Sequence, residues 1–440
     1  MKIASILGLN ARARLFPNQS RHARKIARSK ILTKRILRRA GIPTPRLYKV
    51  FRKNEDIVNF DWRKISSSFA LKPSKSSYGD GIIVVRKKSV DGKAWITTQR
   101  KKLYAEDFDL QVVDILEGAY SIGSVPDIAF CEEYVGRHKV FRQYAYRGTP
   151  DIRVMVYNKV PVMAMLRLPT PESGGRANLH KGGIGVGIDM ETGITTYAVH
   201  HGEYIRHKPG TQKKLSGIKI PYWNQILEIA VRAQAVSDLE LSGVDIVLHP
   251  ERGPMVLEIN SQPGLQIQLA NMAGLRKRLE RVEDLRVLDA EHGVKIAKSL
   301  FSSHIVTRKS KKDEASQVLG VFEKIKVRDA EGKRRMIEAK IDTGAWRTAI
   351  DKTLAQEMGL LTTRNVLWNK RVKSALGIEE RPLIGLTFWL KGKKVVTQAG
   401  VADRKNLAKQ ILIGRLDLGG FLIDMDSINR QRRIRKNPGD

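Results

Sequence analysis

Three oxygen-bearing side chains are spaced so that they could hold a divalent cation. Asp245 lies in one apolar run, Glu258 and Asn260 lie in the next, and the turn-forming stretch 249–254 separates them. Residues two apart in a strand share a face, so Glu258 and Asn260 point the same way, and a turn near 251–252 sets Asp245 opposite Glu258. Two carboxylates and an amide suit Mg²⁺, which prefers oxygen ligands. Ordinary solvent-facing strand ends are the alternative.

A lysine followed by small residues could bind phosphate. Lys72 ends an apolar run, and residues 74–80 then read SKSSYGD. Small residues let backbone N–H groups approach a phosphate, and a neighbouring lysine adds a point charge. The lysine precedes the glycines, so this is not the usual G-x-x-x-x-G-K-[ST] phosphate loop. A plain β-hairpin is the alternative.

The order of the motifs along the chain identifies a family. Lys72 and its loop are followed by EEYV at 132–135, DIR at 151–153, NLHKGG at 178–183 and then the Asp245, Glu258 and Asn260 group. This order resembles the ATP-grasp superfamily. Over about residues 5–290 the chain is most similar to the alpha-L-glutamate ligase-like branch of the RimK-type ligases. The segments that carry the similarity are SKILTKRILRRAGIPTP, PDIRVMVYNKVPVMAMLRLPT, ANLHKGGIGVGIDMETG, LSGVDIV and VLEINSQPGLQIQLAN.

The resemblance implies a role for each matching residue. The cation ligands would be Asp245, Glu258 and Asn260. The nucleotide would be held by Lys30 and Lys72 at its phosphates, by the backbone of Glu133, Tyr134 and Val135 at adenine, by Asp151 near the ribose, and by Asn178 and Arg176 near the triphosphate. Arg153 and Arg167, with Arg176, would bind a substrate carboxylate or stabilise an acyl-phosphate, because a guanidinium can pair with either in a bidentate manner. Cys131, beside the adenine-binding strand, is expected to be a core residue.

The implied reaction is an ATP- and Mg²⁺-dependent (or Mn²⁺-dependent) ligation. ATP phosphorylates a carboxylate, an amine attacks the acyl-phosphate, and an amide forms. RimK-type ligases usually carry a further α/β domain before the helix that matches 29–40, whereas about 28 residues precede it here. The acceptor is therefore not implied. We expect glutamate or another amino acid to be added to an acidic or peptide-like substrate.

A second chemical motif lies near the C-terminus. Asp342, Thr343 and Gly344 follow an apolar run, and ILIG at 411–414 follows about seventy residues later. Over about residues 317–426 this part resembles the RimB-type retropepsin-like family, often labelled ATP-dependent zinc proteases. An aspartic peptidase needs two carboxylates that share a proton. One D-T-G is present, so we expect a homodimer through this domain with Asp342 as the catalytic residue; a catalytically silent binding barrel is the alternative.

The residues of this domain argue against zinc. No histidine or cysteine follows His304, and the sequence contains no H-E-x-x-H motif. A catalytic Zn²⁺ normally takes such ligands. We expect no zinc.

The elements that must position these residues suggest separate domains. A helix over 29–40 begins with Ser29 as its N-cap, and a second helix is expected over 222–239. Short apolar runs broken by glycine fill the C-terminal third. The expected fold is an α/β (α+β) ATP-grasp domain followed by a small all-β retropepsin-like barrel. The expected boundaries are 1–28 for an irregular basic segment, 29–302 for the ligase domain, 303–316 for a linker, 317–428 for the barrel and 429–440 for a basic tail.

The net charge is unusually high. Eighty Lys and Arg residues against 45 Asp and Glu residues give +35, and residues 1–54 contain sixteen basic and no acidic residues. Such a field attracts nucleic acid, anionic lipid or an acidic peptide, so a ribosome-associated or membrane-surface protein is the alternative function. The single cysteine excludes an intrachain disulfide framework and, with no signal peptide recognised, favours the cytoplasm.

Overall fold

The computed structural model describes residues 5–15, 20–58, 60–65, 68–75, 79–121, 123–302, 317–374, 377–405 and 407–426. The chain divides into two compact units, the first of residues 1–297 and 301–303 and the second of residues 298–300 and 304–440. The expected linker lies wholly outside the described residues, as does the basic tail. No helix among the described ranges is both long and apolar enough to cross a membrane.

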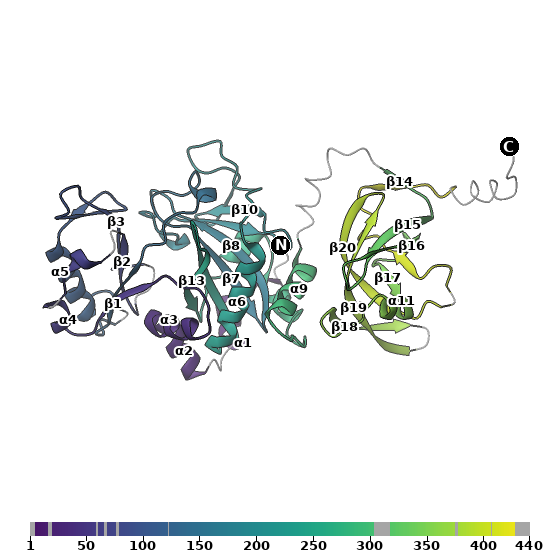
Figure 1. The fold of residues 1–440 in the computed structure, drawn as a ribbon, viewed down its shortest axis with the longest axis horizontal. Helices are drawn as coiled ribbons and strands as arrows, with labels where there is room; N and C mark the ends of the chain where they lie inside the picture. The colour runs from purple at the N-terminus through teal and green to yellow at the C-terminus, as the bar shows by residue number, and fades with distance from the viewer. Residues whose placement is uncertain are drawn as a thin grey trace. The chain divides into compact units, whose positions relative to one another are not determined.

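The first unit contains a small sheet that carries Lys72. Its strand order is β1-β6-β2-β3-β4-β5. The bounds are β1 Leu47–Phe51, β2 Phe69–Pro73, β3 Ile83–Lys88, β4 Trp95–Thr97, β5 Lys102–Leu103 and β6 Ala129–Glu133. Helix α5 (Ala105–Leu116) lies beside this sheet in Figure 1. Trp62, Phe69 and Phe108 meet in the core between them, with ring centroids 4.9–5.8 Å apart.

A larger sheet of the same unit carries the predicted cation ligands. Its strand order is β11-β10-β9-β8-β7-β12-β13. The bounds are β7 Asp151–Tyr157, β8 Val160–Leu168, β9 Ile184–Ile188, β10 Thr195–His200, β11 Glu203–Ile205, β12 Leu241–His249 and β13 Gly253–Asn260. Helix α6 (Trp223–Ser237) packs against β12 and β13. Every residue of β8 is buried, and all of them except Arg167 are apolar.

The remaining helices of the first unit are short. They are α1 Leu9–Leu15, α2 Arg21–Arg28, α3 Lys30–Arg39, α4 Glu55–Val58, α7 Ile267–Asn271, α8 Leu275–Glu280 and α9 Ala290–Phe301. Ser29 caps α3 as expected, because its hydroxyl accepts the N–H of Leu32. The basic segment 1–28 was expected to be irregular, and this was wrong. Helix α2 buries Ala23 and Ile26, too few apolar residues to give a clear pattern in the sequence.

The second unit is a small β barrel. Its strand order is β15-β16-β21-β17-β20-β19-β18, and pairing of β15 with β19 closes it. The bounds are β14 Gln317–Leu319, β15 Phe322–Arg328, β16 Arg334–Ile341, β17 Ala349–Asp351, β18 Val366–Ser374, β19 Gly377–Leu390, β20 Lys393–Ala402, β21 Ile411–Ile413 and β22 Phe421–Ile423, with helix α11 at Lys352–Glu357. Strands β14 and β22 pair separately. The expected all-β architecture is confirmed.

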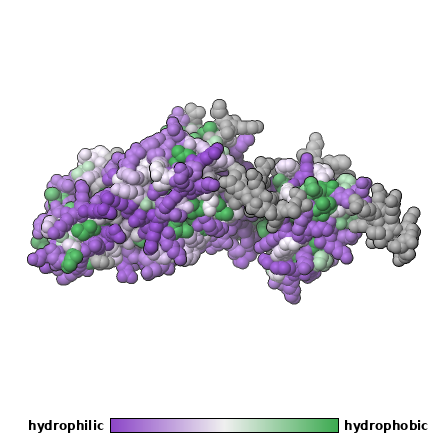
Figure 2. All heavy atoms as spheres, turned by 90° about the horizontal axis from the view of Figure 1, so that it is seen from above, coloured by the Kyte–Doolittle hydropathy of each residue, from purple (hydrophilic) through white to green (hydrophobic). Residues whose placement is uncertain are grey.

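Hydrophilic residues dominate the face seen in Figure 2, on both units, with small scattered apolar patches between them. This surface agrees with the high proportion of charged residues in the sequence.

Candidate nucleotide and metal site

A cavity of about 1370 Å³ in the first unit brings residues of both sheets together. Its volume exceeds the range of roughly 300–1,000 Å³ usual for a small-molecule site, so it has room for a nucleotide and a second substrate. The predicted site residues that line it are Lys30, Lys72, Glu133, Tyr134, Val135, Asp151, Arg153, Arg167, Arg176, Asn178, Glu258 and Asn260. Asp245 is fully buried behind this wall.

The predicted cation ligands are neighbours. Asp245 pairs with Glu258 across β12 and β13, as the spacing predicted. The side-chain nitrogen of Asn260 lies 3.2 Å from Asp245 Oδ2 and 3.4 Å from Glu258 Oε1. Glu258 and Asn260 are half-buried at the cavity wall, and their oxygens are the kind that Mg²⁺ or Mn²⁺ binds. These two residues therefore fit the cation that the sequence predicted.

Asp245 is already engaged by two arginines. Arg153 donates to both of its carboxylate oxygens at 2.7 Å, and Arg167 donates to Oδ2 at 2.6 Å. Burial disfavours the charged carboxylate, but the two guanidinium groups outweigh this and hold the pKa of Asp245 well below its usual range. Direct coordination by Asp245 would require one of these contacts to be exchanged for the cation. In this arrangement Asp245 positions the arginines.

Arg167 links two carboxylates. It also pairs with Asp151, through Nε at 2.5 Å and Nη2 at 2.8 Å. Asp151, Arg153, Arg167 and Asp245 thus form a buried group of two guanidinium and two carboxyl groups, in which burial raises the pKa of Asp151 to about 7. Because its members neutralise one another, removing one would leave an unpaired buried charge. Arg153 and Arg167 reach the cavity wall from this fixed position.

A second buried ion group holds Lys72. Glu132, 1 % exposed, lies 2.6 Å from Lys72 Nζ and 2.5 Å from Lys34 Nζ. Burial opposes the charged form of Glu132, yet the two lysines outweigh it and lower its pKa. Lys30 begins α3 one turn before Lys34, and burial lowers the pKa of its ammonium group. Lys30, Lys34 and Lys72 thus concentrate positive charge at one end of the cavity.

Lys34 was missed by the sequence analysis, and Glu132 was quoted only as part of a motif. Lys34 lies four residues after Lys30, so the two share a helix face, and this spacing was the available signal. Glu132 is 60 residues from Lys72 in sequence, and nothing local shows that they meet.

The expected adenine-binding segment follows β6. Val135 is buried and lines the cavity, whereas the side chain of Glu133 turns to Arg252 and His249. The backbone N–H of Glu133 donates to the carbonyl oxygen of Arg46. That donor is consequently used within the protein. Cys131 is buried as expected, and burial raises the pKa of its thiol well above the ordinary value.

Two loops meet at the cavity mouth. Part of the predicted phosphate loop, residues 76–78, lies outside the described residues. Beyond it, a side chain at Gly79 would meet the Arg176 side chain at 3.5 Å, and Lys181 lies 3.6 Å from Asp80. Asn178 caps the short 3₁₀ turn at Leu179–Lys181 by accepting the N–H of His180. The loop of Arg176 and Asn178 therefore faces the end of the phosphate loop.

Asp342 of the second unit lies in a loop after β16. Its N–H donates to the carbonyl oxygen of Ile413, and its Oδ1 accepts the N–H groups of Gly344 and Ala345 at 2.9 and 3.1 Å. Lys340 lies 3.7 Å from its other oxygen. The loop is thereby fixed, with the second carboxylate oxygen facing the Lys340 ammonium group.

Comparison with known proteins identifies the first unit. The sequence model of the sugar-transfer associated ATP-grasp family matches residues 10–284, more than half of the chain. A probable alpha-L-glutamate ligase of Aeromonas salmonicida is 30% identical over 168 residues, which are 35% of this chain and 44% of that protein. The chain thus spans less than half the length of this curated relative.

Two solved structures give weaker likenesses. An L-amino acid ligase from Bacillus licheniformis is 12% identical, with a TM-score of 0.34, over 60% of this chain and 47% of that one. The protease of simian foamy virus is 18% identical, with a TM-score of 0.17, over 22% of this chain and 90% of that one. Neither TM-score supports a conclusion about this chain. ATP-grasp ligases use ATP with Mg²⁺ or Mn²⁺, and from its match over residues 10–284 this chain belongs to the sugar-transfer associated ATP-grasp family.

Proposed function

We propose that the chain is an ATP- and Mg²⁺-dependent carboxylate–amine ligase. The observation that carries the proposal is the cavity in which Lys72 approaches from one sheet and Glu258 and Asn260 from the other. A cation held there would neutralise phosphate charge and orient the triphosphate for attack by the substrate carboxylate. The relative from A. salmonicida, named as a probable glutamate ligase, supports glutamate or another amino acid as the added group.

The chain's own residues supply positioning and charge. Lys30 and Lys72 would bind the phosphates, and the backbone of Tyr134 and Val135 would bind adenine. Arg153 and Arg167 would orient the substrate carboxylate at the cavity wall, where they are held by Asp245 and Asp151. Such fixed donors stabilise the acyl-phosphate without rearranging during the reaction. The amine then attacks, and phosphate leaves.

An acidic or peptide-like acceptor suits the rim of the cavity. Arg24 and Arg28 of α2 line it and are exposed, and Lys75 and Lys101 line it as well. A substrate with several carboxylates would gain from this field. Phosphate release should therefore be measured with a panel of amino acids and peptides, with mass spectrometry of the products. An amide product made from an acidic acceptor supports the proposal; phosphate release stimulated only by neutral or basic acceptors would remove the acidic-substrate assignment.

A peptidase activity in the second unit is a separate proposal. The fixed carboxylate of Asp342 favours it, and a second copy related by twofold symmetry would supply the other carboxylate. Trp346, beside this loop, is 58 % exposed and is a candidate dimer contact. The expected result is a dimer that cleaves peptides and loses cleavage in Asp342→Asn. Cleavage that survives this substitution would exclude the role.

The basic N-terminal segment is proposed to bind an anionic polymer or membrane surface in the cytoplasm. The exposed residues Arg21, Arg24 and Lys25 of α2 belong to it. Binding to RNA and to anionic vesicles at two salt concentrations separates these partners, because each phosphate contact steepens the salt dependence. Failure of the protein to bind either RNA or anionic vesicles would exclude this binding role for the segment.

A further inference from the structure

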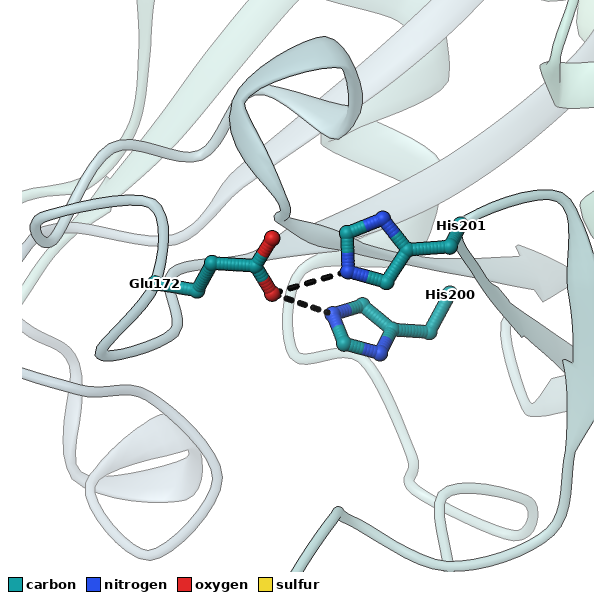
Figure 3. A group of neighbouring side chains, drawn as sticks. All are labelled: Glu172, His200 and His201. Atoms are coloured by element: carbon teal, nitrogen blue, oxygen red, sulfur yellow. Dashed lines mark hydrogen bonds and ion pairs between the residues drawn. The ribbon is translucent and has the colours of Figure 1, made fainter.

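A group of two histidines and a glutamate lies outside the nucleotide site. Glu172 follows β8, whereas His200 ends β10 and His201 begins the turn to β11. Figure 3 shows both imidazole rings turned toward the same carboxylate. Glu172 Oε2 lies 2.8 Å from His201 Nε2 and 3.6 Å from His200 Nε2.

The backbone places both rings on one side. Successive residues of a strand normally point to opposite faces. His201 has a φ of 51° and Gly202 a φ of 82°, which is the two-residue hairpin turn with left-handed backbone at both positions. As a result the His200 and His201 ring centroids are only 4.1 Å apart. Two imidazoles and one carboxylate then surround a single point.

We propose that Glu172, His200 and His201 bind a late first-row divalent cation such as Co²⁺, Ni²⁺ or Zn²⁺. Imidazole nitrogens favour these ions over Mg²⁺. Donors about 2.1 Å from a tetrahedral ion lie about 3.4 Å from one another, and the two distances from Glu172 Oε2 fall on either side of that value. All three ligand atoms lie within 4.8 Å of one another.

The surroundings of the three side chains leave room for an ion. The carbonyl oxygen of Gly182 lies 3.1 Å from His200 Nε2 and already accepts the Thr170 hydroxyl at 2.7 Å, so it borders the site and is not counted as a ligand. Gly182 also makes room for Glu172, because a side chain there would meet the Glu172 carboxyl carbon at 2.7 Å. Glu172 and His201 are more than half exposed, which gives an ion access from solvent.

The bound cation would restrain a loop that lines the cavity. Glu172 and Gly182 lie at the two ends of the segment that contains Arg176 and Asn178, both of which line the cavity. His200 and His201 belong to the hairpin of β10 and β11, which is paired to the large sheet. Bound metal would therefore tie the Glu172 end of this loop to the sheet, while its Gly182 end is already bonded to the Thr170 hydroxyl. This assigns a transition metal to a region for which the sequence predicted none.

The test is metal binding by the full-length, untagged protein. Calorimetry with Ni²⁺ or Zn²⁺, in saturating Mg²⁺ to fill the oxygen-rich site, is expected to show one site per chain. His201→Asn preserves the turn, because Asn-Gly favours the same hairpin, and Glu172→Gln preserves shape. Each is expected to weaken binding at least tenfold. His207→Ala, outside the cluster, is the control and should leave binding unchanged.

A second readout does not depend on ligase activity. Metal should slow amide hydrogen exchange over residues 170–183 in the wild-type protein and not in His201→Asn, and Co²⁺ should give the visible absorption of a nitrogen-ligated tetrahedral site. Absence of a stoichiometric site would overturn the proposal. Equal binding by the wild type and both cluster variants would overturn it as well.

Discussion

Replacing Glu132 by glutamine should destabilise the region around β6 and α3 strongly. The substitution removes the charge that neutralises two lysines while keeping the shape of the side chain. Both lysines border the cavity, but Lys34 is only 2 % exposed, whereas Lys72 is 12 % exposed. Most of the cost should therefore come from Lys34, because Lys72 can turn its ammonium group toward water.

The magnitude follows from the burial of the group. Removing one partner of a buried ion pair costs about 3–5 kcal/mol, since it leaves an uncompensated charge. Glu280→Gln is the control, because Glu280 pairs with Arg276 where both side chains are about half exposed, and such pairs contribute about 0–1 kcal/mol. Urea-dependent hydrogen exchange of peptides from α3 and β6 measures this local opening in the full-length protein.

A double variant separates charge from packing. Lys34→Met in the Glu132→Gln background removes the stranded ammonium group and should recover at least about 1 kcal/mol, within the range of coupling seen for residues in contact. A loss below about 1 kcal/mol in Glu132→Gln would show that water or rearrangement relieves the charges. No recovery in the double variant would show that the cost comes from packing, and either result refutes the buried-pair explanation.

Three further predictions concern the same unit. The pKa of Glu132 in the folded protein lies below its ordinary value of 4.5, so its contribution to stability is present above pH 4.5 and is lost as the pH falls through the folded pKa. The loss of unfolding free energy between pH 7 and pH 3 should therefore be smaller in Glu132→Gln than in the wild type. Gly187→Ala should lower the free energy of unfolding by about 1–3 kcal/mol, because a side chain there would meet the backbone oxygen of Ala270 at 2.2 Å; urea denaturation tests this, and an unchanged midpoint would contradict it. Cys131 should react with a thiol reagent only after unfolding, because burial excludes the reagent and raises the pKa of the thiol, and rapid labelling of the native protein would contradict this.

Local patterns predicted much of the fold. The helices expected over 29–40 and 222–239 are present as α3 and α6, and the apolar run that Lys72 ends forms β2. The hairpin that sets Asp245 opposite Glu258 also followed from spacing alone, because a short turn fixes the register of the strands on either side.

Contacts between distant residues could not be predicted. Asp245 and Arg153 are 92 residues apart, and only the pairing of β12 with β7 brings them together. The sequence therefore shows an aspartate with the right spacing for a cation but does not show that two arginines already neutralise it. The left-handed turn that brings His200 beside His201 was missed for a similar reason, since two adjacent histidines in a strand would be expected to point apart.

The most direct test of the nucleotide site is calorimetric binding of a non-hydrolysable ATP analogue to the full-length protein, with and without Mg²⁺. Binding of the analogue is expected to weaken at least tenfold without Mg²⁺ and in Glu258→Gln. Glu280→Gln is the control, because Glu280 forms an exposed ion pair with Arg276, and this variant should bind the analogue like the wild type. Failure of the wild-type protein to bind the analogue, or binding that is equally tight without Mg²⁺ and in Glu258→Gln, would contradict a cation-dependent nucleotide site in this cavity.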